Sequence, residues 1–236
     1  METAGYTTLT RQSGLMKEMQ VVAHNLANAA TSGYRREGIV FTEHVAKLEG
    51  EGSVSMASAA ARLVDLHQAG LSQTGGTFDL GIQGEGFFMV QTPEGERLTR
   101  AGTFMPSAEG TLVTPDGYPL LDAGGAPVVA PSDTASVRIS TDGTMSASGG
   151  VVAEIGLWRP VDPTSLRHQS GVLFSATEVE PIEQGTIRQG FVEDSNVDPM
   201  TEVARMIEVQ RAYEMGQKFL ESEDQRQKGV IQTLGR

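Results

Sequence analysis

Four histidines are the side chains of this sequence best suited to act as metal ligands or general bases near neutral pH. They are well separated along the chain, at His24, His44, His67 and His168. None belongs to an H-E-x-x-H motif, which would place two histidines and a general base around zinc on one helix face. We therefore predict that each is a surface or packing histidine, and we expect no metal site.

One glycine-rich segment, Gly81–Gly86, has the composition of a phosphate-binding loop. Its glycine order is not that of the dinucleotide fingerprint, and the following Phe87–Val90 is typical of a strand, whereas a phosphate site needs a helix N-terminus there. The sequence also lacks the G-x-S-x-G elbow and the G-x-x-x-x-G-K-[ST] loop. Asp116 and Asp142 each precede a glycine, which indicates turns and not a calcium loop. These observations predict no catalytic residue, no cofactor and no enzymatic activity.

Composition limits the partners that such a chain could have. Its 236 residues include 18 Lys and Arg against 30 Asp and Glu, which gives a formal charge of −12. An acidic surface is repelled by nucleic acid and by anionic membranes, so we expect neither as a partner. No apolar run approaches the length needed for membrane insertion, and the N-terminus lacks the basic and apolar regions of a cleaved secretory signal. The absence of cysteine excludes disulfides and thiolate metal sites.

The negative charge is concentrated in the middle of the chain. Residues 1–50 have a net charge of zero, residues 51–185 of −10, and residues 186–236 of −2. One interpretation is a soluble middle domain that is simply acidic. The other is that both ends are nearly neutral because they pack against copies of themselves.

Both ends of the chain have helical periodicity. Residues 7–30 contain no proline, and their apolar residues follow the a and d positions of a heptad repeat, with Gln12 as the polar exception. The segment 31–33 ends in glycine, which predicts a helix stop there. Asp198-Pro199 is a typical start signal for a second helix, from about Met200, whose apolar stripe also includes Gln210 and Gln217. Two hypotheses remain: the helices pair only with each other, or they pair and also pack against neighbouring subunits.

The middle of the chain predicts an all-β domain. From Gly75 to about Gly185, short apolar runs alternate with turn signals every 8–12 residues, which is typical of an antiparallel sandwich or barrel. The segment Val137–Ala147 has the pattern of a hairpin with a turn at Asp142-Gly143. Residues 49–60 are expected to form a flexible connector. We therefore predict an α+β fold: residues 1–74 and 186–236 form a helical core domain with an extended connector, in which the N- and C-terminal helices pair like a coiled coil, and residues 75–185 form an inserted all-β outer domain.

Three groups of motifs together resemble the flagellar rod and hook family. The first is His24–Asn28 followed by Thr31–Arg36, similar to the family's N-terminal A-N-N-L-A-N box, although His24 replaces its first Asn. The central signature consists of residues 78–88, 98–104 and 110–117, with Leu98 where Tyr is usual. The C-terminal group consists of residues 195–198, 202 and 206–213. The resemblance covers nearly the whole chain, in the family's order.

This resemblance implies a structural subunit of the bacterial flagellar basal body, in the proximal rod. It implies export by the flagellar type III apparatus without a cleaved signal, and assembly into a helical periplasmic shaft that transmits torque from the motor to the hook. The implied partners are other rod proteins, including the distal-rod protein, copies of the chain itself, and the surrounding basal-body rings. Alternatives are a distal-rod member of the same family, a non-catalytic peptidoglycan-binding module, and a hydrolase that acts as the cell wall is pierced.

We predict that twelve residues at the two ends serve subunit packing. The asparagines among them either fix the helix register by hydrogen bonding or act as ordinary caps. The predicted packing residues are Leu9, Met16, Met19, Asn25, Leu26, Asn28, Asn196, Val203, Met206, Ile207, Tyr213 and Leu220.

Overall fold

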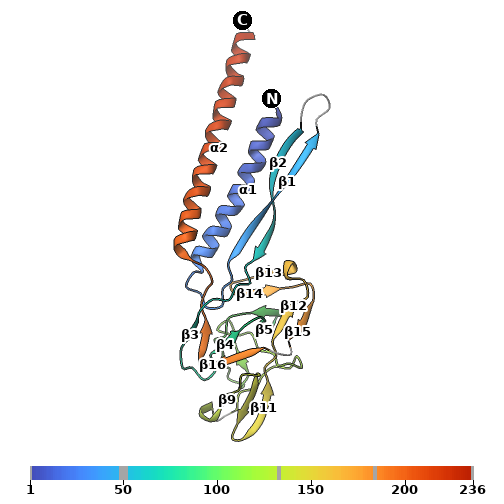
Figure 1. Ribbon diagram of the computed structural model, residues 1–236, viewed down its shortest axis with the longest axis vertical. Coiled ribbons are helices and arrows are strands. Elements are labelled where there is room, and N and C mark those ends of the chain that lie inside the picture. Colours follow the sequence, from blue (N-terminus) through green and yellow to red (C-terminus); the bar gives the residue numbers. More distant parts are fainter. Residues whose placement is uncertain (1, 48–52, 132–133, 183–184, 235–236) are drawn as a thin grey trace. The chain divides into compact units, whose positions relative to one another are not determined.

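The structure is a computed structural model that describes residues 2–47, 53–131, 134–182 and 185–234 (Figure 1). Its contacts define two compact units. The helical unit consists of Met1–Ala27, Glu37–Leu63 and Asp198–Arg236, and the β unit of Asn28–Arg36 and Val64–Val197.

The helical unit contains the two long helices expected at the chain ends. Helix α1 (Glu2–Ala27) packs along helix α2 (Pro199–Leu234), so the predicted pairing of the terminal helices is confirmed (Figure 1). At 1.5 Å per residue, α2 is about 15 Å longer than α1. Therefore α1 cannot cover the full length of α2.

A long two-stranded sheet completes the helical unit. Strand β1 (Glu37–Lys47) pairs with strand β2 (Ser53–Val64), and β1 also contacts α1. The prediction of a flexible connector over residues 49–60 is wrong for residues 53–60, which are part of β2; residues 49–52 lie outside the described residues. Ser and Ala dominate β2 and have low strand propensity, so the strand depends on its pairing with β1.

Helix α2 begins at its predicted start signal. The Asp198 carboxylate accepts a hydrogen bond from the Met200 amide at 3.2 Å and another from the Thr201 hydroxyl. These bonds satisfy donors that the first helical turn leaves without partners. The side-chain bond from Thr201, followed by the amide bond from Met200, lowers the pKa of Asp198 below its usual value of 3.8.

The Asp198 cap makes helix stability depend on pH. Since the pKa of Asp198 is lower in the folded state, its contribution is complete above pH 3.8 and is lost as the pH falls through the folded pKa. We expect Asp198→Asn to reduce this loss. Circular dichroism at 222 nm, followed from pH 6 to pH 2, measures the difference between the two proteins. Identical acid transitions would contradict a role for the Asp198 charge in capping.

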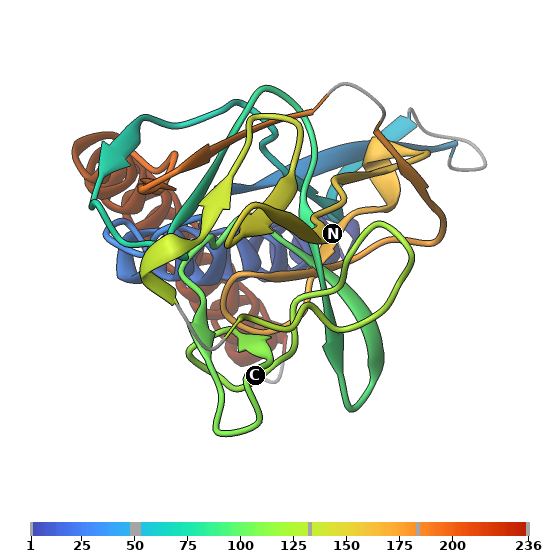
Figure 2. The same cartoon turned by 90° about the horizontal axis from the view of Figure 1, so that it is seen from below.

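The β unit consists of short antiparallel strands in several small sheets. One sheet has the order β13-β14-β6-β5, another has the order β11-β10-β9, and four two-stranded sheets pair β12 with β15, β16 with β4, β17 with β3, and β7 with β8. Figure 2 shows that these strands run in several directions and do not form one continuous sheet. The strands are β3 (Leu71–Gln73), β4 (Leu80–Gln83), β5 (Phe88–Thr92), β6 (Gly95–Thr99), β7 (Met105–Pro106), β8 (Leu112–Val113), β9 (Arg138–Ile139), β10 (Thr144–Ala147), β11 (Gly150–Glu154), β12 (Trp158–Pro160), β13 (Arg167–His168), β14 (Leu173–Ser175), β15 (Val179–Pro181), β16 (Thr186–Gln189) and β17 (Phe191–Glu193).

This arrangement confirms the predicted α+β class, with terminal helices in contact and a central region of antiparallel sheets. The hairpin expected over Val137–Ala147 is present, with Ile139 opposite Met145. The units divide the chain differently from the predicted boundaries. Residues 64–74 and 186–197 belong to the β unit, because β17 pairs with β3 and β16 pairs with β4.

Two hydrophobic clusters stabilise the β unit. The larger one includes Phe78, Phe88 and Phe104, and the smaller one includes Phe87 and Phe174. Edge-to-face contacts join Phe88 to Phe104 at 5.4 Å between ring centroids and Phe87 to Phe174 at 5.5 Å. Such pairs contribute about 0.5–1.5 kcal/mol beyond the burial of their area.

Gly33 has a different role from the predicted helix stop. Helix α1 already ends at Ala27, and Gly33 lies in the β unit with a φ of +72°. A Cβ atom there would lie 2.2 Å from the Ala101 nitrogen and 2.4 Å from the Arg100 carbonyl carbon. Glycine is therefore required at position 33, because the backbone there closely approaches the backbone of Arg100 and Ala101.

We expect Gly33→Ala to destabilise the β unit by more than the roughly 1–3 kcal/mol that an unfavourable backbone conformation alone costs. The matched control is Gly84→Ala, because Gly84 also has a positive φ, of +99°, but its Cβ would meet nothing within 4 Å. Urea denaturation, followed by the fluorescence of the only tryptophan, Trp158, compares the two variants. Equal losses of stability would show that the close approach is unimportant.

Candidate functional site

A buried ion-pair cluster joins distant segments of the β unit. Glu193, at the end of β17, binds Arg35 through Oε1 and Arg100 through Oε2, each at 2.9 Å. The three side chains are only 1%, 1% and 3% exposed, respectively. A buried carboxylate held by two guanidinium groups fixes the segments that carry them, since breaking a buried pair leaves an uncompensated charge.

Backbone groups complete this cluster, which we call the Glu193 cluster. The Ala69 amide donates to Glu193 Oε1 at 3.0 Å, and Arg100 Nη2 donates to the Gly84 carbonyl at 2.7 Å. Arg35 Nη1 donates to the His67 carbonyl. Burial lowers the pKa of Arg100 to about 10, and the negative charge of Glu193 only partly opposes this shift.

Asn196 adds a second link between the same segments. Its side-chain oxygen accepts from the Arg36 amide at 2.6 Å, and its nitrogen donates to the carbonyls of Asp65 and His67 at 3.1 and 3.0 Å. The Asn196 side chain thus holds together three stretches that are far apart in sequence, around residues 36, 65–67 and 196, through hydrogen bonds to the backbone. Each stretch adjoins in sequence a part of the helical unit.

Asn25 forms a comparable network inside the helical unit. Its amide exchanges two hydrogen bonds with the backbone of Glu37, at 2.8 and 2.9 Å, and donates to Glu202 of α2 at 3.2 Å. Asn25 and Glu202 are fully buried. The network therefore connects α1 to both β1 and α2. Asn28, by contrast, lies in the β unit and accepts from the Thr31 hydroxyl at 3.2 Å, within a local turn.

Polar side chains form specific contacts between the two helices. Glu18 on α1 pairs with Arg205 on α2 at 2.5 Å, and Gln12 donates to the Tyr213 carbonyl at 2.8 Å. Gly216 permits this approach, because a Cβ there would lie 2.2 Å from Gln12 Nε2. Polar side chains thus set the register of α1 against α2.

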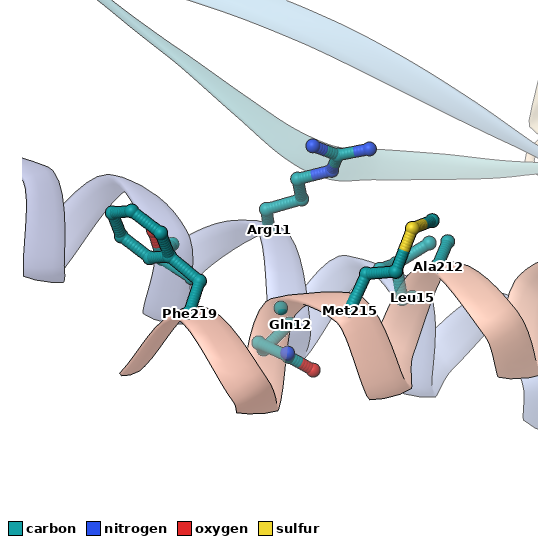
Figure 3. Close-up of a pocket in the computed structure, with 8 residues that line it drawn as sticks. Arg11, Gln12, Leu15, Ala212, Met215 and Phe219 are labelled. Carbon is teal, nitrogen blue, oxygen red and sulfur yellow. The ribbon is translucent and has the colours of Figure 1, made fainter. Parts of the chain in front are cut away.

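A groove of about 380 Å³ opens between the same helices (Figure 3). Helix α1 lines it with Thr8, Arg11, Gln12 and Leu15, and α2 lines it with Ala212, Met215, Gly216 and Phe219. Met215 and Phe219 are exposed. The groove therefore presents apolar surface that the helical unit itself does not cover.

The structure places the predicted packing residues in three different environments. Leu9 and Ile207 are 54% and 45% exposed, and Met16 and Val203 are exposed to a similar extent. Half-buried positions are occupied by Met19, Leu26, Asn28, Asn196, Met206, Tyr213 and Leu220. Asn25 is the predicted residue that is fully buried. Their role in subunit packing remains a prediction.

Sequence reasoning missed the residues of the Glu193 cluster as a group. Arg35 and Arg100 are inside the quoted motifs, but nothing in their spacing shows that they share one carboxylate. Glu202 is also inside a motif, and its burial beside Asn25 depends on the packing of two distant helices.

The described residues contain no group of three or more histidine, aspartate or glutamate side chains placed to hold a metal ion. Among the helices in the described part of the chain, none has an apolar stretch long enough to cross a bilayer.

Comparisons with known proteins agree with these features. A family model for the flagellar hook protein FlgE/F/G D1 domain matches residues 81–147, and one for the C-terminal part of flagellar basal body rod FlgEFG proteins matches residues 188–233. Over its full length the chain is 35% identical to the flagellar basal-body rod protein FlgF of Caulobacter vibrioides and 35% identical to that of Mesorhizobium japonicum, covering 99% of each. It is also 28% identical to the rod protein FlgG of Bacillus subtilis, over 97% of the chain and 96% of that relative.

The chain belongs to the FlgE/F/G family of flagellar rod and hook proteins. Its function is structural and non-catalytic, in the rod of the flagellar basal body. Within the family, full-length identities of 30–35% relate it to FlgF rod proteins.

Proposed function

We propose that the chain is a subunit of the proximal part of the rod and assembles through the exposed apolar faces of its helical unit. In this role the two terminal helices pack against other rod subunits, including the distal-rod protein and copies of the chain. The rod then forms a helical periplasmic shaft that transmits torque from the motor to the hook, inside the surrounding rings. The β unit contributes the outer surface, and the chain is exported unfolded by the flagellar type III apparatus.

The observation that carries this proposal is the apolar surface of the paired helices. Leu9 and Met16 on α1, and Ile207 and Met215 on α2, are all exposed. Exposed apolar patches are typical of a protein interaction surface. A shaft under torque also needs many lateral contacts, because a single helical seam would slip.

Cysteine cross-linking in isolated basal bodies tests the proposal directly. The chain has no cysteine, so a single Leu9→Cys or Ile207→Cys substitution introduces the only reactive thiol. With a matching cysteine in each candidate neighbour, oxidation is expected to give a covalent adduct with another rod subunit. The control is Glu94→Cys on the exposed end of a β-unit hairpin, which is expected to give no adduct with a rod helix.

If neither helical position formed an adduct in basal bodies that contain the protein, the proposed assembly through the helical faces would be overturned. Adducts of Glu94→Cys with rod helices would do the same, because they would place the β unit in the rod wall.

A further inference from the structure

A small hollow in the β unit lies beside the Glu193 cluster. Its volume is about 160 Å³, and all of its lining residues belong to the β unit. Arg35, Arg100 and Arg159 line it together with Glu85, and Phe87 and Pro160 are among its apolar walls. Guanidinium groups are the donors expected for an anion, although Glu193 already pairs with Arg35 and Arg100, and Glu180 with Arg159.

The buried arginines in this hollow have donors to spare. Arg35 and Arg100 share the carboxylate of Glu193. Two less buried carboxylates, Asp65 and Glu85, also act on Arg35 and Arg100, respectively. Within the described residues, the Nε atoms of Arg35 and Arg100 are buried and have no hydrogen-bond partner. Buried donors and charges are costly without partners, so an added anion would be stabilised there.

The size of the hollow indicates what kind of group it accepts. Sites for small molecules usually measure about 300–1,000 Å³, so this one suits a single side chain. Guanidinium donors match the planar geometry of a carboxylate, and the apolar walls suit the methylene groups that carry it. A sugar ring with its substituents would need more room.

We propose that this hollow binds one carboxylate, presented by an acidic side chain of an adjacent rod subunit. This inference rests on the proposed function, since the neighbour is another subunit of the rod. Copies of this chain carry 30 acidic residues each, so suitable side chains are abundant in such an assembly.

Glu85 regulates access to the hollow. Its side chain is 84% exposed and lies 3.8 Å from Arg159, which also binds Glu180 at 2.7 Å. The Glu85 carboxylate therefore competes weakly for the same arginines and is free to swing away when another carboxylate enters. Removal of the Glu85 charge should strengthen binding, and removal of the Arg159 charge should weaken it.

Titration of the full chain with two short peptides tests the site. The probe is acetyl-Ala-Glu-Ala-amide, its control is acetyl-Ala-Gln-Ala-amide, and the readout is the chemical shift of the arginine Nε–H groups. The Glu peptide is expected to shift the Arg35 and Arg100 signals saturably, and the Gln peptide is expected to leave them unchanged. Two further titrations use N-acetylmuramic acid, which represents a cell-wall carboxylate, and inorganic phosphate, which represents a free anion.

Surface variants keep the test independent of folding, since neither Glu85 nor Arg159 is buried. Glu85→Gln is expected to raise the affinity for the Glu peptide about threefold and Arg159→Gln to lower it about threefold, the range of partly exposed ion pairs. The matched control is Arg97→Gln, because Arg97 pairs with Glu94 and does not line the hollow. The affinity of this variant for the Glu peptide should be unchanged.

Unshifted Arg35 and Arg100 signals with the Glu peptide would overturn the proposal, as would equal shifts with the Gln peptide. Binding of N-acetylmuramic acid or phosphate without binding of the Glu peptide would also overturn it, and would assign the hollow to the cell wall or to a free anion. Failure of this titration, while the cysteine adducts between helices still form, would reject the carboxylate site and leave the proposed function intact.

Discussion

Replacing Glu193 with glutamine is expected to lower the free energy of unfolding of the β unit by about 3–5 kcal/mol, the usual cost of breaking a buried ion pair. The substitution keeps the shape of the side chain but leaves Arg35 and Arg100, both almost fully buried, without a compensating charge. It also weakens the bond that Glu193 accepts from the Ala69 amide. Urea denaturation followed by the fluorescence of Trp158 measures the loss, because this tryptophan lies in the β unit.

Glu180→Gln is the matched control for this prediction. Glu180 also pairs with an arginine, Arg159, at 2.7 Å, but both side chains are about half exposed. Exposed pairs contribute little, so the control is expected to change stability by less than about 1 kcal/mol. If Glu193→Gln and Glu180→Gln had equal effects, the Glu193 cluster would not be a main source of stability in the β unit.

The parts of the fold that depend on local sequence were predictable. Residues 7–30 have helical periodicity with Gln12 as a polar exception, Asp198-Pro199 is a start signal, and the hairpin at Asp142-Gly143 has its own turn residues. In each case neighbouring residues alone favour the structure that forms. One wrong prediction concerned residues 53–60, which are mainly Ser and Ala, have weak strand propensity and form a strand through pairing with β1.

The parts that depend on distant segments were not predictable in detail. Strands β16 and β17 pair with β4 and β3, more than a hundred residues earlier, which no local pattern indicates. The Glu193 cluster likewise joins residues 35, 100 and 193. At the contact of the helices, Gln12 was the polar exception in a heptad, yet it is buried and binds the Tyr213 carbonyl. Periodicity identifies an apolar stripe, but it does not reveal whether a polar side chain finds its partner across the interface.

Replacing Ile207 with aspartate is expected to abolish motility while leaving the isolated chain folded. Ile207 is exposed on α2, so a charge there costs the monomer little, within about 0.5 kcal/mol for an ordinary surface position. In the assembled rod the same carboxylate would be buried against a neighbouring subunit without a partner, which costs several kcal/mol. Swimming in soft agar measures motility, and electron microscopy of basal bodies measures rod assembly. Circular dichroism of the purified chain measures whether it is folded.

Two further variants separate assembly from folding. Ser222→Asp adds the same charge at an exposed polar position of α2 and is expected to preserve motility. Val209→Asp adds it at a position that is buried in the helical unit, so this variant should lose helical structure even as a monomer. Normal swimming by Ile207→Asp would contradict the helical-face model. A loss of helical structure in the purified Ile207→Asp chain would contradict the expectation that Ile207 contributes little to the stability of the monomer.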